Sequence, residues 1–325
     1  MANKDFVSVM NRYRKDLKVG LALSSGSARG EAHVGVVKAI LEKDVPVDFI
    51  AGTSAGAIVG AYFASRGEVD GLEKAVREST PKQMMDMMSL DLAIKFKGFI
   101  GEKKSLKWLK ELIGGIYFSD LKIPLAVIAT DMNSGEEVVI TKGSVLEAVR
   151  ASIAMPVLFT PTKSQGRFLV DGGFSNPLPV DTVKKMGANF AIASNVIRTP
   201  EVAKAEFIKA GSRLKNEIMD MVVSEELEKA KSALARSIPG VMGWATSAEE
   251  KDLPNMFNTL VSSVYTMEYT FVKSRIKEAD ITISPDVRNI NMLDFFHGDE
   301  VIAKGYEAAS RRLSSFLNRL GAKVR

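Results

Sequence analysis

The sequence predicts an α/β fold in which a mainly parallel sheet is covered by helices on both faces. Short apolar runs alternate along the chain with segments whose apolar residues recur at helical spacing. The runs at 18–24 and 47–52 are each followed by a turn of small residues and then by a helical segment. Strands that are buried on both faces have this unbroken apolar character. With 325 residues, 46% of them hydrophobic, the chain can form a sizeable core.

The N-terminal part contains two strand–turn–helix units. The first has a strand at 18–24, the turn SSGSARG and a helix at about 32–43. Apolar residues recur there at helical spacing, namely Val34, Val37, Ile40 and Leu41. The second unit has a strand at 47–52, a turn at Ser54 and a helix at about 55–65. This order is typical of neighbouring parallel strands joined by helices.

The same alternation continues toward the C-terminus. We predict further strands at 123–130, 136–140, 167–170, 189–195 and 280–284. We predict further helices at about 70–79, 103–113, 144–151, 179–186 and 299–318. No repeat of fixed period interrupts this order, so we expect a single domain over residues 1–325.

Residues 201–275 differ from the rest of the chain because they are almost entirely helical in pattern. Glu and Lys recur at i,i+4 spacing within 217–236, which stabilises an exposed helix. Two interpretations are open for this segment. It is either an extra helical layer packed on the core, or an insert that acts as a lid or a membrane-facing cap.

The composition excludes several kinds of site. The chain has no cysteine, which excludes disulfides, cysteine nucleophiles and thiolate metal sites. Its two histidines, His33 and His297, are far apart in sequence, so we expect no metal site. The net charge of +5 comes from scattered basic residues, and we expect no nucleic-acid partner.

The sequence shows neither a secretory signal nor an apolar run that is long enough to span a membrane. The first residues are polar and lack the apolar core of a secretory signal. No apolar run approaches the roughly 20 residues that span a bilayer. We therefore expect a cytoplasmic protein whose contact with a membrane, if any, is peripheral.

Ser54 stands between two glycines, Gly52 and Gly56, at a predicted strand-to-helix turn. This is the spacing and the context of a nucleophile elbow, which exposes a serine hydroxyl at the start of a helix. Glycines suit such a turn because side chains would collide there. The motif alone is common, but here the strand and the helix that it requires are both predicted.

The upstream turn, Ser24 to Gly30, also opens a helix, so its N–H groups can bind an anion. In acyl transfer such groups form an oxyanion hole for the tetrahedral intermediate. In a nucleotide site they bind phosphate. The glycine spacing, Gly26, Gly30 and Gly35, does not match a dinucleotide fingerprint, and no P-loop occurs. Nucleotide binding is therefore the less favoured alternative.

A serine nucleophile needs a base, and three residues are candidates. His33 lies on the helix that begins at the upstream turn and is expected to be a packed or capping residue. His297 lies in a polar segment and is expected at the surface. Asp171 ends a predicted strand and precedes Gly172 and Gly173. On spacing alone, this Asp-Gly-Gly segment is either a catalytic turn or an ordinary one.

These three segments occur in the order and spacing of a known family. The chain resembles the patatin-like phospholipase family, and in particular its bacterial acyl hydrolases, in three motifs: Gly26-x-x-Arg29-Gly30, Gly52-Thr-Ser54-Ala-Gly56 and Asp171-Gly-Gly173. Segments 129–135, 148–161, 176–179 and 305–309 also resemble the family. The resemblance covers roughly residues 18–315.

The resemblance implies a three-layer α/β/α fold and a Ser–Asp dyad without histidine. It implies that Ser54 is the nucleophile and that Asp171 is its base. It places the oxyanion hole at Gly26, Ser27 and Ala28, with Arg29 as a loop-positioning or anion-binding residue. The remaining motif glycines would shape the elbow and the turns: Gly30, Gly52, Gly56, Gly172 and Gly173. The substrate would be an acyl lipid, and no cofactor or metal would be needed.

Two features make this assignment demanding. An ordinary aspartate has a pKa of about 3.9, so it is a weak base unless it is partly desolvated. Ser25 and Ser27 stand where the family usually has glycine. A serine held at positive φ would cost roughly 1 kcal/mol or more. The leading hypothesis is a lipid ester hydrolase of phospholipase, lysophospholipase or carboxylesterase type that forms an acyl-enzyme. The alternative is a catalytically weak lipid-binding or regulatory module.

Overall fold

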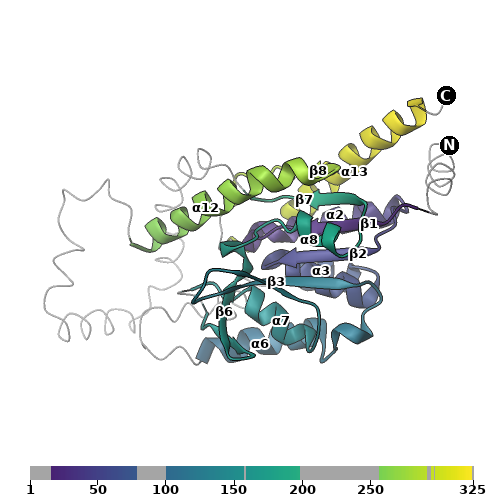
Figure 1. Ribbon diagram of the computed structural model, residues 1–325. Coiled ribbons are helices and arrows are strands. Elements are labelled where there is room, and N and C mark those ends of the chain that lie inside the picture. The colour runs from purple at the N-terminus through teal and green to yellow at the C-terminus, as the bar shows by residue number, and fades with distance from the viewer. Residues whose placement is uncertain are drawn as a thin grey trace, which may run out of the picture.

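The computed structural model describes residues 16–78, 100–156, 159–197, 256–290, 294–295 and 297–323. These residues form one eight-stranded sheet with helices on both sides (Figure 1). The strands are β1 (Val19–Leu23), β2 (Phe49–Thr53), β3 (Leu125–Asp131), β4 (Glu137–Ile140), β5 (Thr162–Ser164), β6 (Arg167–Asp171), β7 (Phe190–Ser194) and β8 (Ile281–Ile283). The predicted α/β class is confirmed.

The sheet is parallel in its centre and antiparallel at one side. Its order is β5-β6-β3-β2-β1-β7-β8, and β4 also pairs with β3. The five strands from β3 to β8 run parallel, whereas β4 and β6 pair with β3 in the antiparallel sense. All strands expected from the sequence are present. The additional strand, β5, reads Thr-Lys-Ser and has no apolar pattern by which it could be predicted.

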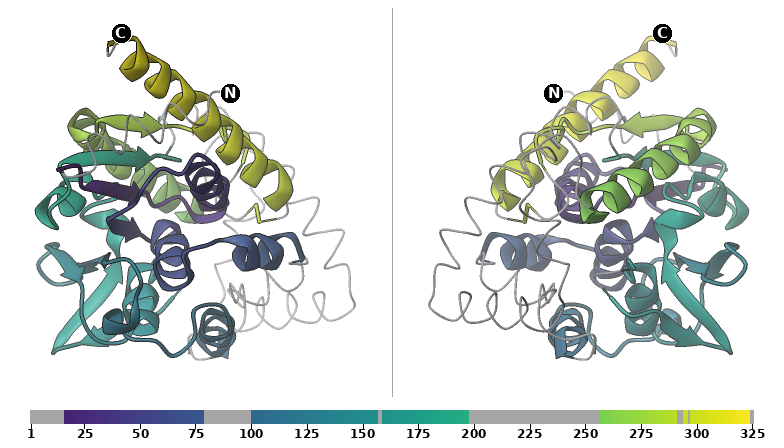
Figure 2. Two further views of the ribbon diagram at one scale, coloured as in Figure 1. Left: turned by 90° about the vertical axis from the view of Figure 1, so that its right-hand side faces the viewer. Right: turned by 90° about the vertical axis from the view of Figure 1, so that its left-hand side faces the viewer.

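The helices lie at the expected positions, with ends shifted by a few residues, and three short 3-10 turns accompany them. The helices are α2 (Ala32–Glu42), α3 (Ala55–Arg66), α4 (Asp70–Glu78), α6 (Ile100–Ile113), α7 (Val145–Ser152), α8 (Val180–Lys185), α12 (Met256–Glu278) and α13 (Gly298–Lys323). The 3-10 turns are η1 (Ser27–Glu31), η2 (Phe118–Asp120) and η3 (Gly172–Phe174). Figure 2 shows the C-terminal end of α13 extending beyond the sheet.

Alternate residues of the central strands enter two separate hydrophobic cores. In β1, Leu21 and Leu23 pack in the core shared with α2, α3, α6, α7 and α13, whereas Ala22 packs in the core shared with α8 and α12. Gly20 lies on the second side, where a Cβ would come within 2.7 Å of Val183 on α8. The sheet is therefore the middle of three layers, as predicted (Figure 1 and Figure 2).

The segment predicted as helical over 201–275 lies largely outside the described residues. Its described part begins at Met256 and forms α12, which continues to Glu278 and packs on α8 and η3. Helix at this end of the segment is therefore confirmed. Its interpretation as an insert or lid, and the single domain over 1–325, remain predictions.

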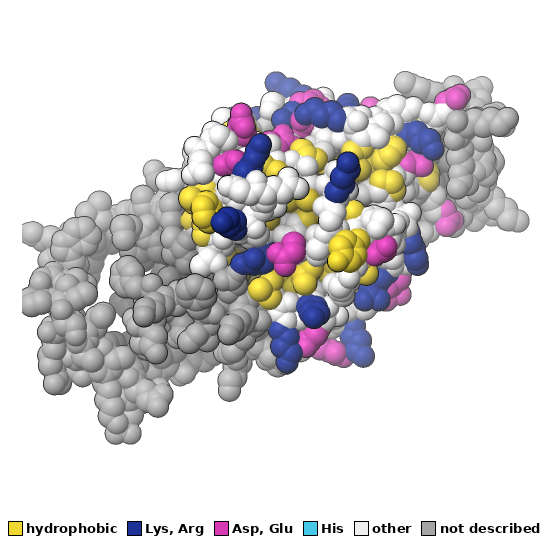
Figure 3. All heavy atoms as spheres, turned by 60° about the horizontal axis from the view of Figure 1, so that its bottom comes forward, with side chains coloured by type: hydrophobic (Ala, Val, Ile, Leu, Met, Phe, Trp, Pro, Cys, Tyr) yellow, Lys and Arg dark blue, Asp and Glu magenta, His cyan; other side chains and the backbone are white. Residues whose placement is uncertain are grey.

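The surface of the described part is mixed in character. Figure 3 shows basic, acidic and hydrophobic side chains interspersed on one face of the molecule. The most exposed large hydrophobic residues are Tyr117, Met132, Val139, Phe168 and Phe271. None of the helices in the described ranges is both long enough and apolar enough to cross a membrane.

Candidate active site

Ser54 lies between β2 and α3 with a backbone conformation that is rare for a side chain-bearing residue. Its φ is 53° and its ψ is −117°, a strained combination typical of a nucleophile elbow. Its N–H donates to Oγ of Ser152 at 2.8 Å, a buried serine at the end of α7. Its hydroxyl donates to Oδ2 of Asp171 at 2.7 Å. The turn therefore directs the hydroxyl toward a single carboxylate.

Asp171 is the last residue of β6 and pairs with Ala129 of β3. Its carboxyl group is held on both sides, because Oδ1 accepts the N–H of Gly173 at 2.8 Å while Oδ2 faces Ser54. Only 3% of the residue is exposed. Burial raises the pKa of Asp171 to about 6, against the opposing effects of the bonds from Ser54 and Gly173. This partial desolvation makes the carboxylate a stronger base than an ordinary aspartate.

His33 supports the upstream turn and does not face Ser54. Its Nε2 bonds the carbonyl oxygen of Ser24 at 2.9 Å, and its Nδ1 bonds Oγ of Ser194 at 2.8 Å. Burial lowers the pKa of His33 to about 4, so the ring is neutral near pH 7. His297 is half-exposed and lies 3.3 Å from Asp294. Both histidines are placed as expected.

The upstream turn packs directly against the elbow. A Cβ on Gly30 would stand 2.3 Å from Cβ of Ala55, the residue that follows the nucleophile candidate. A Cβ on Gly56 would stand 2.3 Å from the carbonyl oxygen of Leu23. The other motif glycines are equally confined, with such approaches of 2.3 to 2.4 Å at Gly26, Gly52, Gly172 and Gly173. A side chain would collide with backbone at Gly52, Gly56 and Gly172, and with a neighbouring side chain at Gly26, Gly30 and Gly173.

Gly56→Ala is expected to lower the free energy of unfolding by about 1–3 kcal/mol, since the clash is with backbone that cannot move aside. Chemical denaturation of the variant would measure the loss. Gly115→Ala is the matched control, because no atom lies within 4 Å of the Cβ position at Gly115. Equal stability of the two variants would show that the close approach at Gly56 is wrong.

Of the two serines that replace family glycines in this turn, one has a strained backbone conformation. Ser27 has a φ of 50°, which is unfavourable for a residue with a side chain, whereas Ser25 is not in this region. The 3-10 turn η1 begins at Ser27, and the N–H of Arg29 closes on the carbonyl oxygen of Gly26 at 3.2 Å. The first N–H groups of such a turn have no acceptor within it. Ser27 and Ala28 can therefore offer theirs to an anion.

Arg29 is completely buried and contacts an aromatic ring. Its Cζ lies 4.5 Å from the ring centre of Tyr265 on α12. Within the described ranges, none of its three guanidinium nitrogens has a hydrogen-bond partner. The side chain thus faces the interior behind the turn, and not the solvent.

Three residues at the site were not found from the sequence. The Ser152 hydroxyl oxygen accepts the N–H of the elbow. From α12, Tyr265 and Glu268 contact the upstream turn. Ser152 falls in a segment that resembles the family, but nothing marked it as a contact of Ser54. Tyr265 and Glu268 lie in a helical segment with no motif. Only the tertiary packing of α12 brings them to the site.

No candidate metal centre accompanies these residues. In the part of the chain that the structure describes, no three histidine, aspartate or glutamate side chains come together as metal ligands. The polar groups at the site are the Ser54 hydroxyl, the Asp171 carboxylate and the turn amides. This set can transfer an acyl group from an ester to serine and then to water.

Known proteins share this region of the chain. The family model described as "Patatin-like phospholipase" matches residues 21–184. An uncharacterized NTE family protein of Mycobacterium tuberculosis is 36% identical over 176 residues, which are 54% of this chain and 48% of that protein. Neuropathy target esterase sws of Drosophila melanogaster is 33% identical over 199 residues, which are 60% of this chain and 14% of that protein.

The chain thus spans about half the length of its mycobacterial relative and much less of the fly protein. Among solved structures, VipD from Legionella pneumophila aligns with a TM-score of 0.46 and 15% identity, covering 92% of this chain and 67% of VipD. The family match includes Ser54, Asp171 and the upstream turn, whereas α12 lies outside it.

Proposed function

Because this chain belongs to the patatin-like phospholipase family, we propose that it is a serine hydrolase of lipid esters, with Ser54 as nucleophile and Asp171 as base. The observation that carries the proposal is the 2.7 Å hydrogen bond from the Ser54 hydroxyl to a buried carboxylate. It occurs at a strained strand-to-helix turn, beside a second turn that opens a helix. Nucleophile, base and anion-binding amides are then within one site.

In the first half of the reaction, Oγ of Ser54 attacks the ester carbonyl carbon while Oδ2 of Asp171 takes its proton. The carbonyl oxygen becomes negative, and the N–H groups of Gly26, Ser27 and Ala28 stabilise it. The N-terminal end of α3, which begins at Ala55, adds a favourable dipole. The alcohol then leaves with the proton from Asp171, and the acyl group remains on Ser54 as an ester.

In the second half, water replaces the alcohol. Asp171 takes a proton from this water, whose oxygen attacks the acyl carbonyl carbon and forms a second tetrahedral intermediate at the same amides. Collapse of the intermediate releases the fatty acid, and Asp171 returns the proton to Oγ of Ser54. The site needs no histidine, because the same carboxylate acts as base and acid in both halves.

The pKa of Asp171, raised to about 6, sets the expected pH dependence. The base must be ionised, so kcat/KM for a neutral ester should fall about tenfold per pH unit below pH 6 and level off above it. A pH–rate profile with a substrate that does not itself titrate measures this. An acidic limb near pH 4 would contradict the desolvated carboxylate.

The proposal extends to substrate, surroundings and domain organisation. Phospholipid or lysophospholipid is the favoured substrate class, and a simple acyl ester is the near alternative. Neither a cofactor nor a nucleic acid takes part.

Met132 and Phe168 are exposed and adjacent, since the N–H of Met132 donates to the carbonyl oxygen of Phe168. They could meet a lipid aggregate in a cytoplasmic, peripherally bound protein. Residues 201–275 would be an insert or lid within a catalytic domain over 1–325.

Release of fatty acid tests this function. The chain would be incubated with detergent micelles that carry phosphatidylcholine, lysophosphatidylcholine or a long-chain nitrophenyl ester, with and without prior treatment by an alkyl fluorophosphonate. We expect release from at least one substrate and none after treatment. Release that persists after treatment would contradict a serine mechanism, and a folded chain that releases nothing would contradict the enzyme.

One observation favours a second candidate, a lipid-binding or regulatory module with weak catalysis. Ser27 holds a φ of 50° within the proposed oxyanion turn, where glycine would be unstrained. If this strain misplaces the amides, the chain would bind lipid without turnover. Vesicle binding in the absence of fatty acid release would favour this candidate. The Ser27→Gly variant should then gain activity, because glycine removes the strain.

A further inference from the structure

Helix α12 brings a second buried carboxyl group, that of Glu268, to the candidate site. The Ser25 hydroxyl donates to Oε1 of Glu268 at 2.5 Å, although the two residues are 243 positions apart. Both are almost completely buried. Ser25 is one of the two serines that replace family glycines, and Glu268 lies outside the region matched by the family model. The contact therefore joins the matched region to a helix outside it.

The same carboxyl group also touches the turn that follows Asp171. A Cβ on Gly173 would stand 2.3 Å from Oε1 of Glu268 and 3.1 Å from Oδ1 of Asp171. Both carboxyl groups therefore lie close to Gly173, whose N–H donates to Oδ1 of Asp171. Glu268 links the oxyanion turn, through Ser25, to the turn that orients the base.

One helical turn earlier, α12 makes a second contact with the oxyanion turn. The ring of Tyr265 lies against the guanidinium of Arg29, with 4.5 Å between Cζ and the ring centre. Such a contact between a cation and an aromatic face is favourable, and more so when it is buried. Ser25 and Arg29 bracket the three residues whose N–H groups would hold the oxyanion. Helix α12 therefore holds the turn at both ends.

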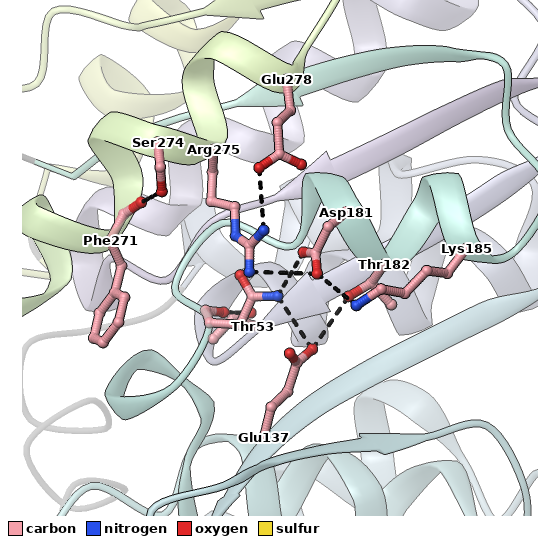
Figure 4. A network of polar contacts seen from close by, with 10 residues as sticks. Thr53, Glu137, Asp181, Thr182, Lys185, Phe271, Ser274, Arg275 and Glu278 are labelled. Carbon is pink, nitrogen blue, oxygen red and sulfur yellow. Dashed lines mark hydrogen bonds and ion pairs between the residues drawn. The ribbon is translucent and has the colours of Figure 1, made fainter.

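The opposite end of α12 is fixed to the elbow strand by a polar network (Figure 4). Arg275 forms an ion pair of 3.3 Å with Asp181 of α8, and Asp181 accepts a hydrogen bond from Nδ2 of Asn176 at 2.8 Å. The carbonyl oxygen of Asn176 accepts from Oγ1 of Thr53 at 2.7 Å. Thr53 immediately precedes Ser54, so the network ties the position of the helix to that of the nucleophile.

We propose that Glu268 is a positioning residue that holds the oxyanion turn, through Ser25, at a fixed distance from Ser54 and Asp171. The inference rests on the proposed function, since an oxyanion turn matters only if acyl transfer occurs there. Glu268 does not touch the reacting atoms. It acts through Ser25, and the alignment of donors with the developing oxyanion is where small displacements are costly.

The electrostatic surroundings indicate which variant best imitates Glu268. The groups that face its carboxyl are Ser25 and Arg29 from the oxyanion turn and Asp171 from β6. Burial, reinforced by the charge of Asp171, raises the pKa of Glu268 to about 7, while the Ser25 bond and Arg29 oppose this. On α8, Asp181 pairs with Lys185 of the same helix and with Arg275 near the C-terminal end of α12. Below pH 7 the carboxyl is mainly neutral, so glutamine resembles it closely.

Kinetics at pH 6.5 test the consequence for catalysis. Glu268→Ala and Ser25→Ala should each lower kcat at least tenfold with little change in KM, and the double variant should be no worse than either one. Glu268→Gln should recover most of the loss, because its amide oxygen still accepts from Ser25. Ser274→Ala, on the same helix but exposed and hydrogen-bonded to the carbonyl oxygen of Phe271 within that helix, is the control and should stay within twofold. Additive losses, or no recovery with glutamine, would overturn the proposal.

Hydrogen exchange separates this inference from the proposed function. Amides of residues 24–31 should exchange faster in Glu268→Ala than in the native chain, and at near-native rates in Glu268→Gln and Ser274→Ala. This result does not require activity. Faster exchange in a chain without turnover would support the positioning role and reject the hydrolase. Unchanged exchange in a folded Glu268→Ala would overturn the positioning role, whatever the activity.

Discussion

Ser54→Ala is expected to reduce turnover by about a millionfold. The hydroxyl is the only group at the proposed site that forms the covalent intermediate, so no neighbouring residue can replace it. Alanine removes one oxygen and leaves the N–H bond from residue 54 to Ser152 intact. The fold should therefore survive. Fatty acid release by the purified variant, measured against the native chain, checks this.

The control for this prediction is a serine that contacts the site without serving as nucleophile. Ser175 lies just beyond η3 and bonds Oγ of its side chain to Oγ1 of Thr130 at 2.8 Å. Ser175→Ala should retain most of the native rate. If Ser54→Ala kept substantial activity while Ser175→Ala lost it, the nucleophile would be wrongly assigned.

Asp171→Asn is expected to lower kcat/KM by about 10²–10⁴, the usual contribution of a general base. Asparagine can still accept the N–H of Gly173, so the turn should keep its shape. It cannot take the Ser54 proton. The loss should appear in kcat, with KM changed little, because the base acts on the reacting atoms and not on lipid binding.

The stability of the same variant provides an independent check on the pKa. The pKa of Asp171 is raised to about 6 in the folded chain, so the folded state loses stability as pH rises from about 4 through 6. Removing the charge should therefore raise the melting temperature at pH 8 more than at pH 5. A variant that is less stable at pH 8 than the native chain would show that the carboxylate stabilises the fold.

The sequence predicted the sheet well because its strands are buried on both faces and read as apolar runs. The apolar run at 18–24 predicts a strand, and β1 spans Val19–Leu23; the run that predicts β3 is equally clear. Strand β5 was missed, since its residues are polar and its pairing with β6 comes from the turn between them. Periodicity predicts a strand when burial requires its residues to be apolar. It fails for a polar strand that forms only because it pairs with a neighbouring strand.

The site was predictable where the backbone geometry itself demands particular residues. Gly52 and Gly56 signalled the elbow because only glycine fits its close approaches, and Asp171 was signalled by the glycines behind it. Glu268 carried no such mark. A glutamate in a helical pattern is expected at the surface until the fold shows the hydroxyl of Ser25 that donates to it.

The sequence predicts that a serine at positive φ would be strained in this turn, but it does not predict which serine has that conformation. The replacement of a family glycine by serine raised the question, and the structure assigns the strain to Ser27 and not to Ser25. Ser25 instead has a partner. Backbone dihedrals of a turn depend on what packs around it, so sequence alone could not distinguish the two serines.

Covalent labelling of Ser54 tests the central claim most directly. The native chain, Ser54→Ala and Asp171→Asn would be treated with a long-chain alkyl fluorophosphonate in detergent micelles, and their intact masses measured over time. We predict a single adduct on the native chain, none on Ser54→Ala and much slower labelling of Asp171→Asn. An adduct that persists in Ser54→Ala, or a folded native chain that is never labelled, would contradict a Ser54 nucleophile activated by Asp171.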